Sequence, residues 1–453
     1  MQKLFFDHAL IGDGWADNVT ITHEAGTITA VERDSTRGDA AYGGSIALPG
    51  LPNLHSHTFQ RGMAGLAETR GPSGDSFWTW RQVMYGFLGA LTPEDVEAIA
   101  AYAFLEMLEG GFTAVAEFHY LHHAIGGVPY ANLAEHCERI AAAAEATGIG
   151  LTLLPVFYAQ GGFGGQPAGE GQRRFLNDPD RFAALLEGAR KAVARLPDAR
   201  IGIAPHSLRA VTPESLAAVL PLAGDAPIHI HVAEQTKEVE DCLAWCGRRP
   251  VEWLLDNAPV DGRWCLIHAT HLTDAEVAGI AGSGAVAGLC PITEANLGDG
   301  IFAGVDFVRH GGVYGVGSDS NIEITAPGEL RQLEYSQRQA LRGRNLMARQ
   351  QGESTARRLY DEACRGGARA LGRAVGALAP GHRADIVVLD GAHVDLAPMR
   401  GDRWLDAYLF VAGKAVLDRV YVGGRQVVSG GRHEARETVE AAYRRTLARL
   451  VTT

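Results

Sequence analysis

Cysteine is scarce in this sequence and shows no pairing pattern. Six cysteines occur in 453 residues, and none belongs to a C-x-x-C pair or a dense framework. The chain therefore lacks the signature of a disulfide scaffold or of a zinc ribbon. We expect reduced and mostly buried thiols, as in a cytoplasmic protein, at Cys137, Cys242, Cys246, Cys265, Cys290 and Cys364.

Excess positive charge and long apolar runs are also missing. Lys and Arg number 41 against 53 Asp and Glu, which gives a formal net charge of −12. This balance argues against nucleic acid or an anionic membrane as the main partner. No stretch of about 20 apolar residues occurs, so no membrane span is expected. Residues 1–8 carry no sustained apolar run before a small-residue cleavage site, so we expect no signal peptide.

The composition is that of a globular enzyme with a large core. Hydrophobic residues make up 46 % of the chain and charged residues 21 %. The length exceeds one ordinary domain but fits a (β/α)8 barrel with an added small domain. The expected fold class is therefore α/β.

Short alternating strands occur at both ends of the chain, and neither set can form a core alone. We predict that residues 1–47 and 376–453 together form one small β-sandwich domain, interrupted by everything between them. The tail after Gly430 has helical spacing and is expected to pack on a surface. The strands are predicted at 19–22, 26–31, 384–389, 416–422 and 425–428.

Residues 48–375 alternate between apolar strand-like runs and amphipathic segments such as 93–109 and 181–195. This alternation predicts a closed parallel barrel, whose active site lies at the C-terminal ends of the strands. A Gly-rich stretch at 161–171 lacks the setting of a phosphate cradle and is interpreted as a lid or a plain loop. The eight strands are predicted at 48–57, 111–118, 150–157, 200–205, 226–232, 263–268, 285–290 and 312–317.

The first of these strands ends in His55-Ser56-His57. Side chains alternate along a strand, so the two imidazoles share a face, roughly 7 Å apart. Such a pair can form half of a metal site. An H-x-H on an edge strand can equally face solvent, so partners from other strands decide between the two interpretations.

Three further strands end in His or Asp at a comparable height. His229 and His231 share a face of the fifth strand, and His231, nearer its C-terminal end, is the better ligand. The sixth strand ends at His268, and the eighth is followed by Asp319. The carboxyl ends of barrel strands meet at one rim, so the joint pattern predicts a metal site. Its predicted ligands are His55, His57, His231 and Asp319.

Three imidazoles and one carboxylate suit Zn²⁺ with a position left open for water, although ligand type leaves iron or manganese possible. The ion lowers the pKa of water towards neutrality and so supplies hydroxide. His268 and Asp319 are the candidates to take the water proton. Glu234, three residues past His231, can pass a proton to a substrate nitrogen.

These motifs resemble the amidohydrolase superfamily over nearly the whole chain. They are the H-S-H at 55–57, the H-V-A-E at 231–234, the H-A-T-H at 268–271 and the S-D at 318–319. Binuclear members commonly bridge their metals with a carbamylated lysine at strand four. Strand four here ends in His206-Ser207, and the lysines of the barrel, Lys191 and Lys237, lie elsewhere. A single ion, as in the deaminase branch, is implied.

Within that branch, five stretches resemble the hydrolases that act on N-formimino-L-glutamate: 53–61, 77–81, 117–123, 205–210 and 293–300. Two guanidinium groups in strand-end loops also suit a substrate with two carboxylates. The alternatives are surface salt bridges for the arginines and a structural role for the glutamine. The resemblance assigns substrate binding to Gln60, Arg81, Tyr120, His206 and Arg209.

Three neighbouring histidines could be mistaken for a second metal cluster: His119, His122 and His123. We interpret them as loop residues, with one or two orienting Tyr120.

The expected reaction is hydrolytic deamination of N-formimino-L-glutamate to N-formyl-L-glutamate and ammonia, a step of histidine degradation. His268 takes the water proton, Glu234 protonates the departing nitrogen, and Asp319 relays a proton while ligating the metal. A homodimer is implied by resemblance. The rival interpretations are a guanine-type aminohydrolase, which needs an aromatic slot, and a non-catalytic metal-binding scaffold, which would not need Glu234 or His268.

Overall fold

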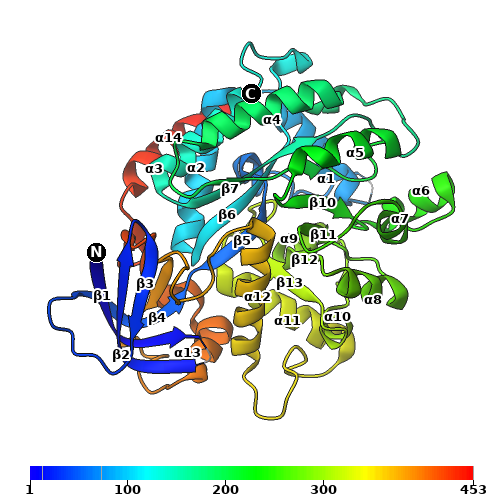
Figure 1. The fold of residues 1–453 in the computed structure, drawn as a ribbon. Coiled ribbons are helices and arrows are strands. Elements are labelled where there is room, and N and C mark those ends of the chain that lie inside the picture. Colours follow the sequence, from blue (N-terminus) through cyan, green and yellow to red (C-terminus); the bar gives the residue numbers. More distant parts are fainter. Residues whose placement is uncertain (13, 73, 452–453) are drawn as a thin grey trace.

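Strands from the two ends of the chain share one sheet in the computed structural model, which describes residues 1–12, 14–72 and 74–451 (Figure 1). The strand order is β17-β16-β15-β14-β4-β1-β2-β3. The strands are β1 (Gln2–Ile11), β2 (Gly14–Glu24), β3 (Thr27–Glu32), β4 (Ala41–Pro49), β14 (Ile386–Leu389), β15 (Leu417–Val422), β16 (Arg425–Ser429) and β17 (Arg432–His433).

The two ends of the chain meet at the pair of β4 and β14. These strands run antiparallel, with Ile46 opposite Leu389 and Pro49 opposite Ile386. Alternate residues of this sheet form a small separate core, in which the Phe6 ring lies edge-on to Tyr421. The prediction that the two ends assemble together is confirmed, because neither set of strands buries its apolar face alone.

The remaining strands are parallel and form two sheets. One has the order β5-β6-β7-β8 with β9 beside β7, and the other the order β10-β11-β12-β13. Every residue of β5, β6, β7, β10, β11 and β12 is buried, which explains their continuous apolar runs. The strands are β5 (Leu51–Ser56), β6 (Phe112–His119), β7 (Gly150–Phe157), β8 (Arg200–Ile201), β9 (Ala204–Pro205), β10 (Ile228–Val232), β11 (Trp264–His268), β12 (Val286–Leu289) and β13 (Val313–Val316).

Isolated parallel bridges link the two parallel sheets on both sides. Ser56 pairs with Asp319 at one junction, and Ile203 pairs with Ile228 at the other. The second junction explains why the predicted fourth strand is split into β8 and β9. The Gly202 amide donates to Leu153 of β7, whereas the Ile203 amide donates to Pro227, next to β10. The chain thus changes hydrogen-bonding partner between these two residues.

Helices surround the parallel strands (Figure 1). The predicted helix at 93–109 has these bounds because Thr92 and Asp95 form a capping box around Pro93, the first helical residue. The helices are α1 (Phe77–Leu88), α2 (Pro93–Glu109), α3 (Glu135–Thr147), α4 (Pro179–Val193), α5 (Pro213–Val219), α6 (Thr236–Cys246), α7 (Pro250–Asn257), α8 (Asp274–Ser283), α9 (Pro291–Leu297), α10 (Gly304–Arg309), α11 (Ala326–Leu341), α12 (Thr355–Leu371), α13 (Asp402–Ala407) and α14 (Arg436–Val451).

The tail forms α14 and packs against α2, as its helical spacing predicts. The rings of Tyr102 and Tyr443 stack with centroids 4.0 Å apart, and Arg436 pairs with Glu109. The Tyr443 hydroxyl donates to the carbonyl of Arg61 at 3.2 Å. Among the helices described, none combines the length and apolar character needed to cross a membrane.

Candidate metal centre and active site

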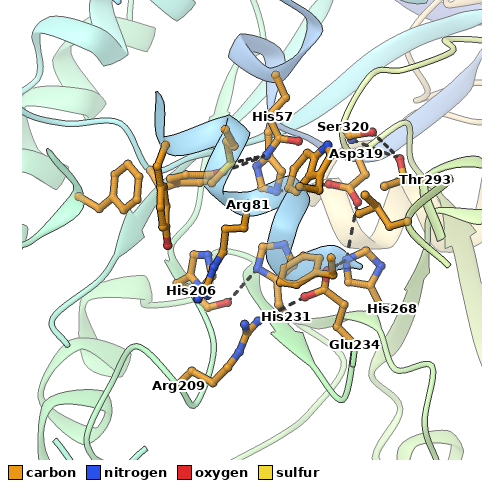
Figure 2. Close-up of a pocket in the computed structure, with 18 of the residues that line it drawn as sticks. His57, Arg81, His206, Arg209, His231, Glu234, His268, Thr293, Asp319 and Ser320 are labelled. Carbon is orange, nitrogen blue, oxygen red and sulfur yellow. Dashed lines mark hydrogen bonds and ion pairs between the residues drawn. The ribbon is translucent and has the colours of Figure 1, made fainter. Parts of the chain in front are cut away.

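The segment after β13 pairs with the end of β5 and carries Asp319 to the two histidines there. The Asp319 amide donates to the carbonyl of His55 at 2.9 Å, and the His57 amide donates to the carbonyl of Asp319 at 2.9 Å. These two hydrogen bonds hold Asp319 beside residues 55–57, although the two segments lie far apart in the sequence. Figure 2 shows the Asp319 side chain beside His57, with His231 and His268 below them.

The four predicted ligands lie close together, with His55 next to His231 and to Asp319. The Nε2 atoms of His55 and His231 are 3.0 Å apart. Asp319 Oδ1 lies 3.5 Å from His55 Nε2 and 3.4 Å from His57 Nε2. Ligand atoms bound at about 2.0–2.1 Å to one tetrahedral ion are separated by about 3.3 Å, so these spacings fit a shared cation.

Backbone carbonyls fix the tautomers of two of the imidazoles. His57 Nδ1 lies 2.7 Å from the carbonyl oxygen of Phe118, and His231 Nδ1 lies 3.0 Å from that of His206. A carbonyl oxygen only accepts, so each Nδ1 carries the proton and each Nε2 keeps a lone pair free for a metal ion.

The protonation states also suit a metal. Burial lowers the pKa of His55 to about 3 and holds the pKa values of His57 and His231 below their usual value. Neutral imidazole is the form that binds metal ions. Burial alone would raise the pKa of Asp319, but the hydrogen bond and charge of His55, with the neighbouring histidines, hold it below its usual value. The set is three neutral imidazoles and one carboxylate.

Within the described residues, three groups of possible ligand atoms lie close enough to hold an ion. Two groups have His55 in common: His55 with His231 and His268, and His55 with His57 and Asp319. The third group is His268, Cys290 and Glu294. Burial raises the pKa of the Cys290 thiol well above its usual value, which disfavours the thiolate that metals bind.

His268 lies at the centre of several carboxylates. Its Nε2 is 3.8 Å from Glu234 Oε1 and 3.7 Å from Asp319 Oδ2, and its Nδ1 is 3.3 Å from Glu294 Oε1. Burial lowers the pKa of His268, but the charges of Glu234 and Asp319 and the hydrogen bond to Glu294 raise it to about 10. Both sequence-predicted proton carriers, His268 and Glu234, therefore lie together beside the metal ligands.

The backbone is strained where the strands end at this site. Three residues have positive φ values in the left-handed region: Ala233 at 52°, His268 at 67° and Asp319 at 42°. L-residues adopt this region rarely, and such strain is concentrated at functional sites. At these residues the chain turns away from the strand direction at the C-terminal ends of β10, β11 and β13.

The ligands form the floor of a pocket whose walls include the predicted substrate residues (Figure 2). Arg209 is one of them, with only 11 % of its side chain exposed. Its Nη2 lies 3.3 Å from Glu234 Oε2, and its Nε lies 3.8 Å from Glu238 Oε2. The alternative of an exposed surface salt bridge therefore does not describe Arg209, which lies between the pocket and two buried carboxylates.

Arg81 enters the same pocket from α1 (Figure 2). Its guanidinium carbon lies 4.5 Å from the ring centroid of Trp78 and 5.6 Å from that of Tyr85. Its buried Nε has no hydrogen-bond partner, and no carboxylate pairs with it in the described part of the chain. A buried N–H donor without an acceptor is costly, so the pocket favours an anionic ligand at this Nε.

Gln60 and Tyr120 form one wall and bond to each other. Gln60 Nε2 donates to the Tyr120 hydroxyl at 2.9 Å, and that hydroxyl lies 3.2 Å from the sulfur of Met84. The Oε1 atom of Gln60 is buried without a partner. Both predicted residues therefore line the pocket, and the chain itself holds the orientation of Tyr120.

The histidines after β6 do not reach that hydroxyl in the described structure. Each donates through Nε2 to a backbone carbonyl: His119 to Leu121, His122 to Val156 and His123 to Leu176. Because a carbonyl only accepts, these ring nitrogens are the protonated donors. The prediction that one or two of them orient Tyr120 finds no hydrogen bond in support, and none belongs to a described metal-capable group.

Sequence reasoning missed several side chains of the pocket. Tyr158 directly follows β7 and could have been found by inspecting every strand end, as was done for histidine. Four residues of α1 were harder to place, because only the fold shows that this helix covers the strand ends. The missed residues that line the pocket are Phe77, Trp80, Met84, Tyr85, Tyr158, Phe175, Thr293, Leu297 and Ser320.

Comparison with known proteins identifies the class. A family model described as "Amidohydrolase family" matches residues 46–427, and the chain belongs to this family. A formimidoylglutamate deiminase of Pseudomonas aeruginosa is 52 % identical over 455 residues, which cover 100 % of both chains. An 8-oxoguanine deaminase of the same organism is 29 % identical, over 85 % of this chain and 83 % of the relative.

Solved structures agree on the fold. An amidohydrolase from Brucella melitensis superimposes with a TM-score of 0.95 at 53 % identity, with 100 % of both chains covered. An adenosine deaminase from Xanthomonas campestris, solved with bound zinc, gives a TM-score of 0.83 at 21 % identity, over 100 % of this chain and 99 % of that one. At that identity the second likeness shows the fold alone.

Proposed function

We propose that this chain hydrolyses N-formimino-L-glutamate to N-formyl-L-glutamate and ammonia, a step of histidine degradation. The observation that carries the proposal is one pocket lined both by side chains able to ligate a metal and by two guanidinium groups. The full-length identity of 52 % to a formimidoylglutamate deiminase supports the same substrate. An amidine and two carboxylates on one small molecule match the two halves of the pocket.

We also propose that the two parallel sheets form one closed barrel. The bridges at Ser56 and Asp319 and at Ile203 and Ile228 support the closure of both parallel sheets into one (β/α)8 barrel. We place this barrel at 48–375. The sheet built from 1–47 and 376–453 is then the small β-sandwich of the family, with α14 as its final element.

The residues that would hold the metal are His55, His57, His231 and Asp319. Three nitrogens and one oxygen at the spacings given above fit one Zn²⁺, and Fe²⁺ takes the same ligand types. Such an ion, when bound, polarises water and lowers its pKa towards neutrality. The absence of a lysine at 205–207 is consistent with one ion per chain.

The side chains around that point then move protons. A cation on Asp319 would offset part of the negative charge that raises the pKa of His268. Neutral His268 would then take the first proton that water loses as its oxygen bonds to the formimino carbon, and Asp319 would relay the second as the carbonyl forms. Glu234 delivers a proton to the terminal nitrogen, the carbon–nitrogen bond breaks, and ammonia leaves. The separations of His268 Nε2 from Glu234 Oε1 and Asp319 Oδ2, 3.8 and 3.7 Å, support proton transfer among the three through a substrate or water between them.

The pocket walls would hold the glutamate part. Arg81 has an unused Nε donor, and Arg209 is already oriented by Glu234 and Glu238. Planar guanidinium groups bind carboxylates through two parallel hydrogen bonds. We assign one or both carboxylates to these arginines, with Gln60, Tyr120 and His206 as neutral contacts.

The test is ammonia release by purified, metal-loaded protein. N-Formimino-L-glutamate and guanine are supplied side by side, and the first product is identified by proton NMR. We expect turnover of the amidine and formation of N-formyl-L-glutamate. Turnover of guanine with none of the amidine would overturn the proposal in favour of a heterocycle deaminase.

A further inference from the structure

A buried tyrosine lines the same pocket and has no role in the reaction described so far. Tyr158 follows β7 directly, and only 5 % of its surface is exposed. Its ring lies against His206 with centroids 4.6 Å apart and against Phe175 at 5.6 Å. The ring is therefore fixed, and the direction of its hydroxyl hydrogen remains to be explained.

Gln172 settles that direction. The Gly169 amide donates to Gln172 Oε1 at 2.7 Å, and a backbone amide can only donate. The oxygen of the side-chain amide must therefore face Gly169, which leaves Nε2 to donate to the Tyr158 hydroxyl at 2.5 Å. The hydroxyl oxygen is an acceptor in this pair, so its own hydrogen points elsewhere.

Two cationic side chains, Arg81 and Arg209, line the same pocket as Tyr158. Burial raises the pKa of the Tyr158 hydroxyl, and the charges of Arg209 and Arg81 oppose that rise. Guanidinium groups have no acceptor, so neither can take the hydroxyl hydrogen. In the described part of the chain, the Tyr158 hydroxyl accepts from Gln172 and donates to no acceptor. The pocket thus holds an unused O–H donor and two arginines. Arg81 and Arg209 each have a buried Nε without a hydrogen bond.

We infer that Tyr158 is a further substrate-binding residue, which donates a hydrogen bond to the carboxylate held by the arginines, and that Gln172 is its positioning residue. The inference rests on the proposed function and deepens it. It also gives a role to the Gly-rich stretch at 161–171, because Gln172 follows this stretch directly and bonds to the Tyr158 hydroxyl. The ligand class is an anion with planar oxygens, and the donors match one carboxylate.

The first test is Tyr158→Phe, which removes one oxygen and keeps the ring. We expect KM for N-formimino-L-glutamate to rise about ten- to a hundredfold, as for a lost hydrogen bond to a charged group, with kcat changed less than about threefold. Tyr335→Phe, on the exposed side of α11, is the matched control and should leave both constants unchanged. An unchanged KM in Tyr158→Phe overturns the inference.

Two truncated substrates separate binding from a structural role. N-Formiminoglycine lacks the side-chain carboxylate, and 4-formamidinobutanoate lacks the α-carboxylate. The effect of Tyr158→Phe on kcat/KM should vanish for the one that lacks the contacted carboxylate and persist for the other. An equal effect on both would show that the variant disturbs the pocket as a whole.

Gln172→Met tests the positioning role, because methionine has nearly the same shape and no donor. We expect a KM increase of about three- to tenfold, and the double variant with Tyr158→Phe should match Tyr158→Phe alone. Additive effects would overturn the positioning role. Gln339→Met, on an exposed face, is the control.

A binding measurement makes the inference independent of turnover. Glutarate carries two carboxylates and no amidine, so it tests the anion site without the reaction. We expect glutarate to bind the wild type and to bind Tyr158→Phe about tenfold more weakly. No glutarate binding to the wild type overturns the inference, whereas tight glutarate binding without turnover of N-formimino-L-glutamate overturns only the proposed function.

Discussion

Glu294 holds His268 through one carboxylate oxygen. Oε1 lies 3.3 Å from His268 Nδ1 and also accepts the amide of Cys290 at 2.8 Å. The carboxylate is therefore fixed by the backbone, and it keeps the proton on Nδ1 so that Nε2 faces Glu234 and Asp319. Contacts of this kind set the tautomer and orientation of functional histidines.

Replacing this glutamate should slow the reaction without weakening substrate binding. We expect Glu294→Ala to lower kcat about ten- to a hundredfold with KM little changed, and Glu294→Gln, which keeps an acceptor, to lower it less. Steady-state kinetics and metal analysis measure the effect. Glu187→Ala, at an exposed helical position, is the control. Full kcat in metal-loaded Glu294→Ala would contradict the positioning of His268.

Removing the metal should abolish activity and lower stability. A ligand that binds only the folded state stabilises it by about 4 kcal/mol at 1,000 times its Kd. Dialysis against a chelator should therefore lower the thermal midpoint, and Zn²⁺ should restore both midpoint and turnover. His57→Ala should already be inactive and respond little to the chelator, while His310→Ala, on an exposed surface, should behave as wild type. A chelated protein with full turnover would contradict the metal site.

Arg81 should matter for binding rather than for chemistry. Arg81→Met removes the charge, and we expect KM for N-formimino-L-glutamate to rise about ten- to a hundredfold. Arg81→Lys should also be impaired, because lysine cannot bind a carboxylate through a planar pair of donors or stack on Trp78 in the same way. Arg309→Met, whose side chain is 72 % exposed, is the control. Equal KM values in all four proteins would remove Arg81 from the binding site.

Glu117 should make stability depend on pH. Its Oε1 accepts from the amide and hydroxyl of Thr58, while Oε2 has no partner and burial raises the pKa of the carboxyl to about 7. The folded state then holds a proton that the unfolded state releases near its ordinary pKa. This contribution is present in full below about pH 4.5 and is lost as pH rises through 7.

Glu117→Gln removes that dependence and keeps the acceptor for Thr58. The free energy of unfolding of the wild type, minus that of Glu117→Gln, should fall by about 2–3 kcal/mol between pH 5 and pH 8. Denaturant unfolding of both proteins at the two pH values measures this difference. A difference that is constant or rises with pH would show that Glu117 is ionised in the fold.

Much of the site could be predicted because parallel strands bring their carboxyl ends together. His55, His57, His231, His268 and Asp319 each follow an apolar run, so their convergence followed from the alternation of strands and helices. Residues that only position another functional side chain do not follow a strand, so the sequence carried no signal for them. Glu294 lies one helical turn inside α9, and its contact with His268 depends on how that helix packs.

Two predictions about organisation stay predictions: domain bounds at 47/48 and 375/376, and a homodimer. The described sheet joins both chain ends through β4 and β14, and β4 itself runs to Pro49, where β5 follows after one residue. The passage from one sheet to the next is therefore a continuous strand path rather than a linker.

What the sequence by itself determined was the class of site. The residues at the strand ends supply three imidazoles, a carboxylate and a proton carrier. They lie close together because alternate side chains share a face and because parallel strands end at the same rim. What only the tertiary structure decided was the direction of each hydrogen bond around that rim. The carbonyl of His206 sets the tautomer of His231, and two glutamate side chains hold Arg209. Gln172 makes the Tyr158 hydroxyl an acceptor, so its own hydrogen points elsewhere. These partners come from other segments of the chain, which no local pattern encodes.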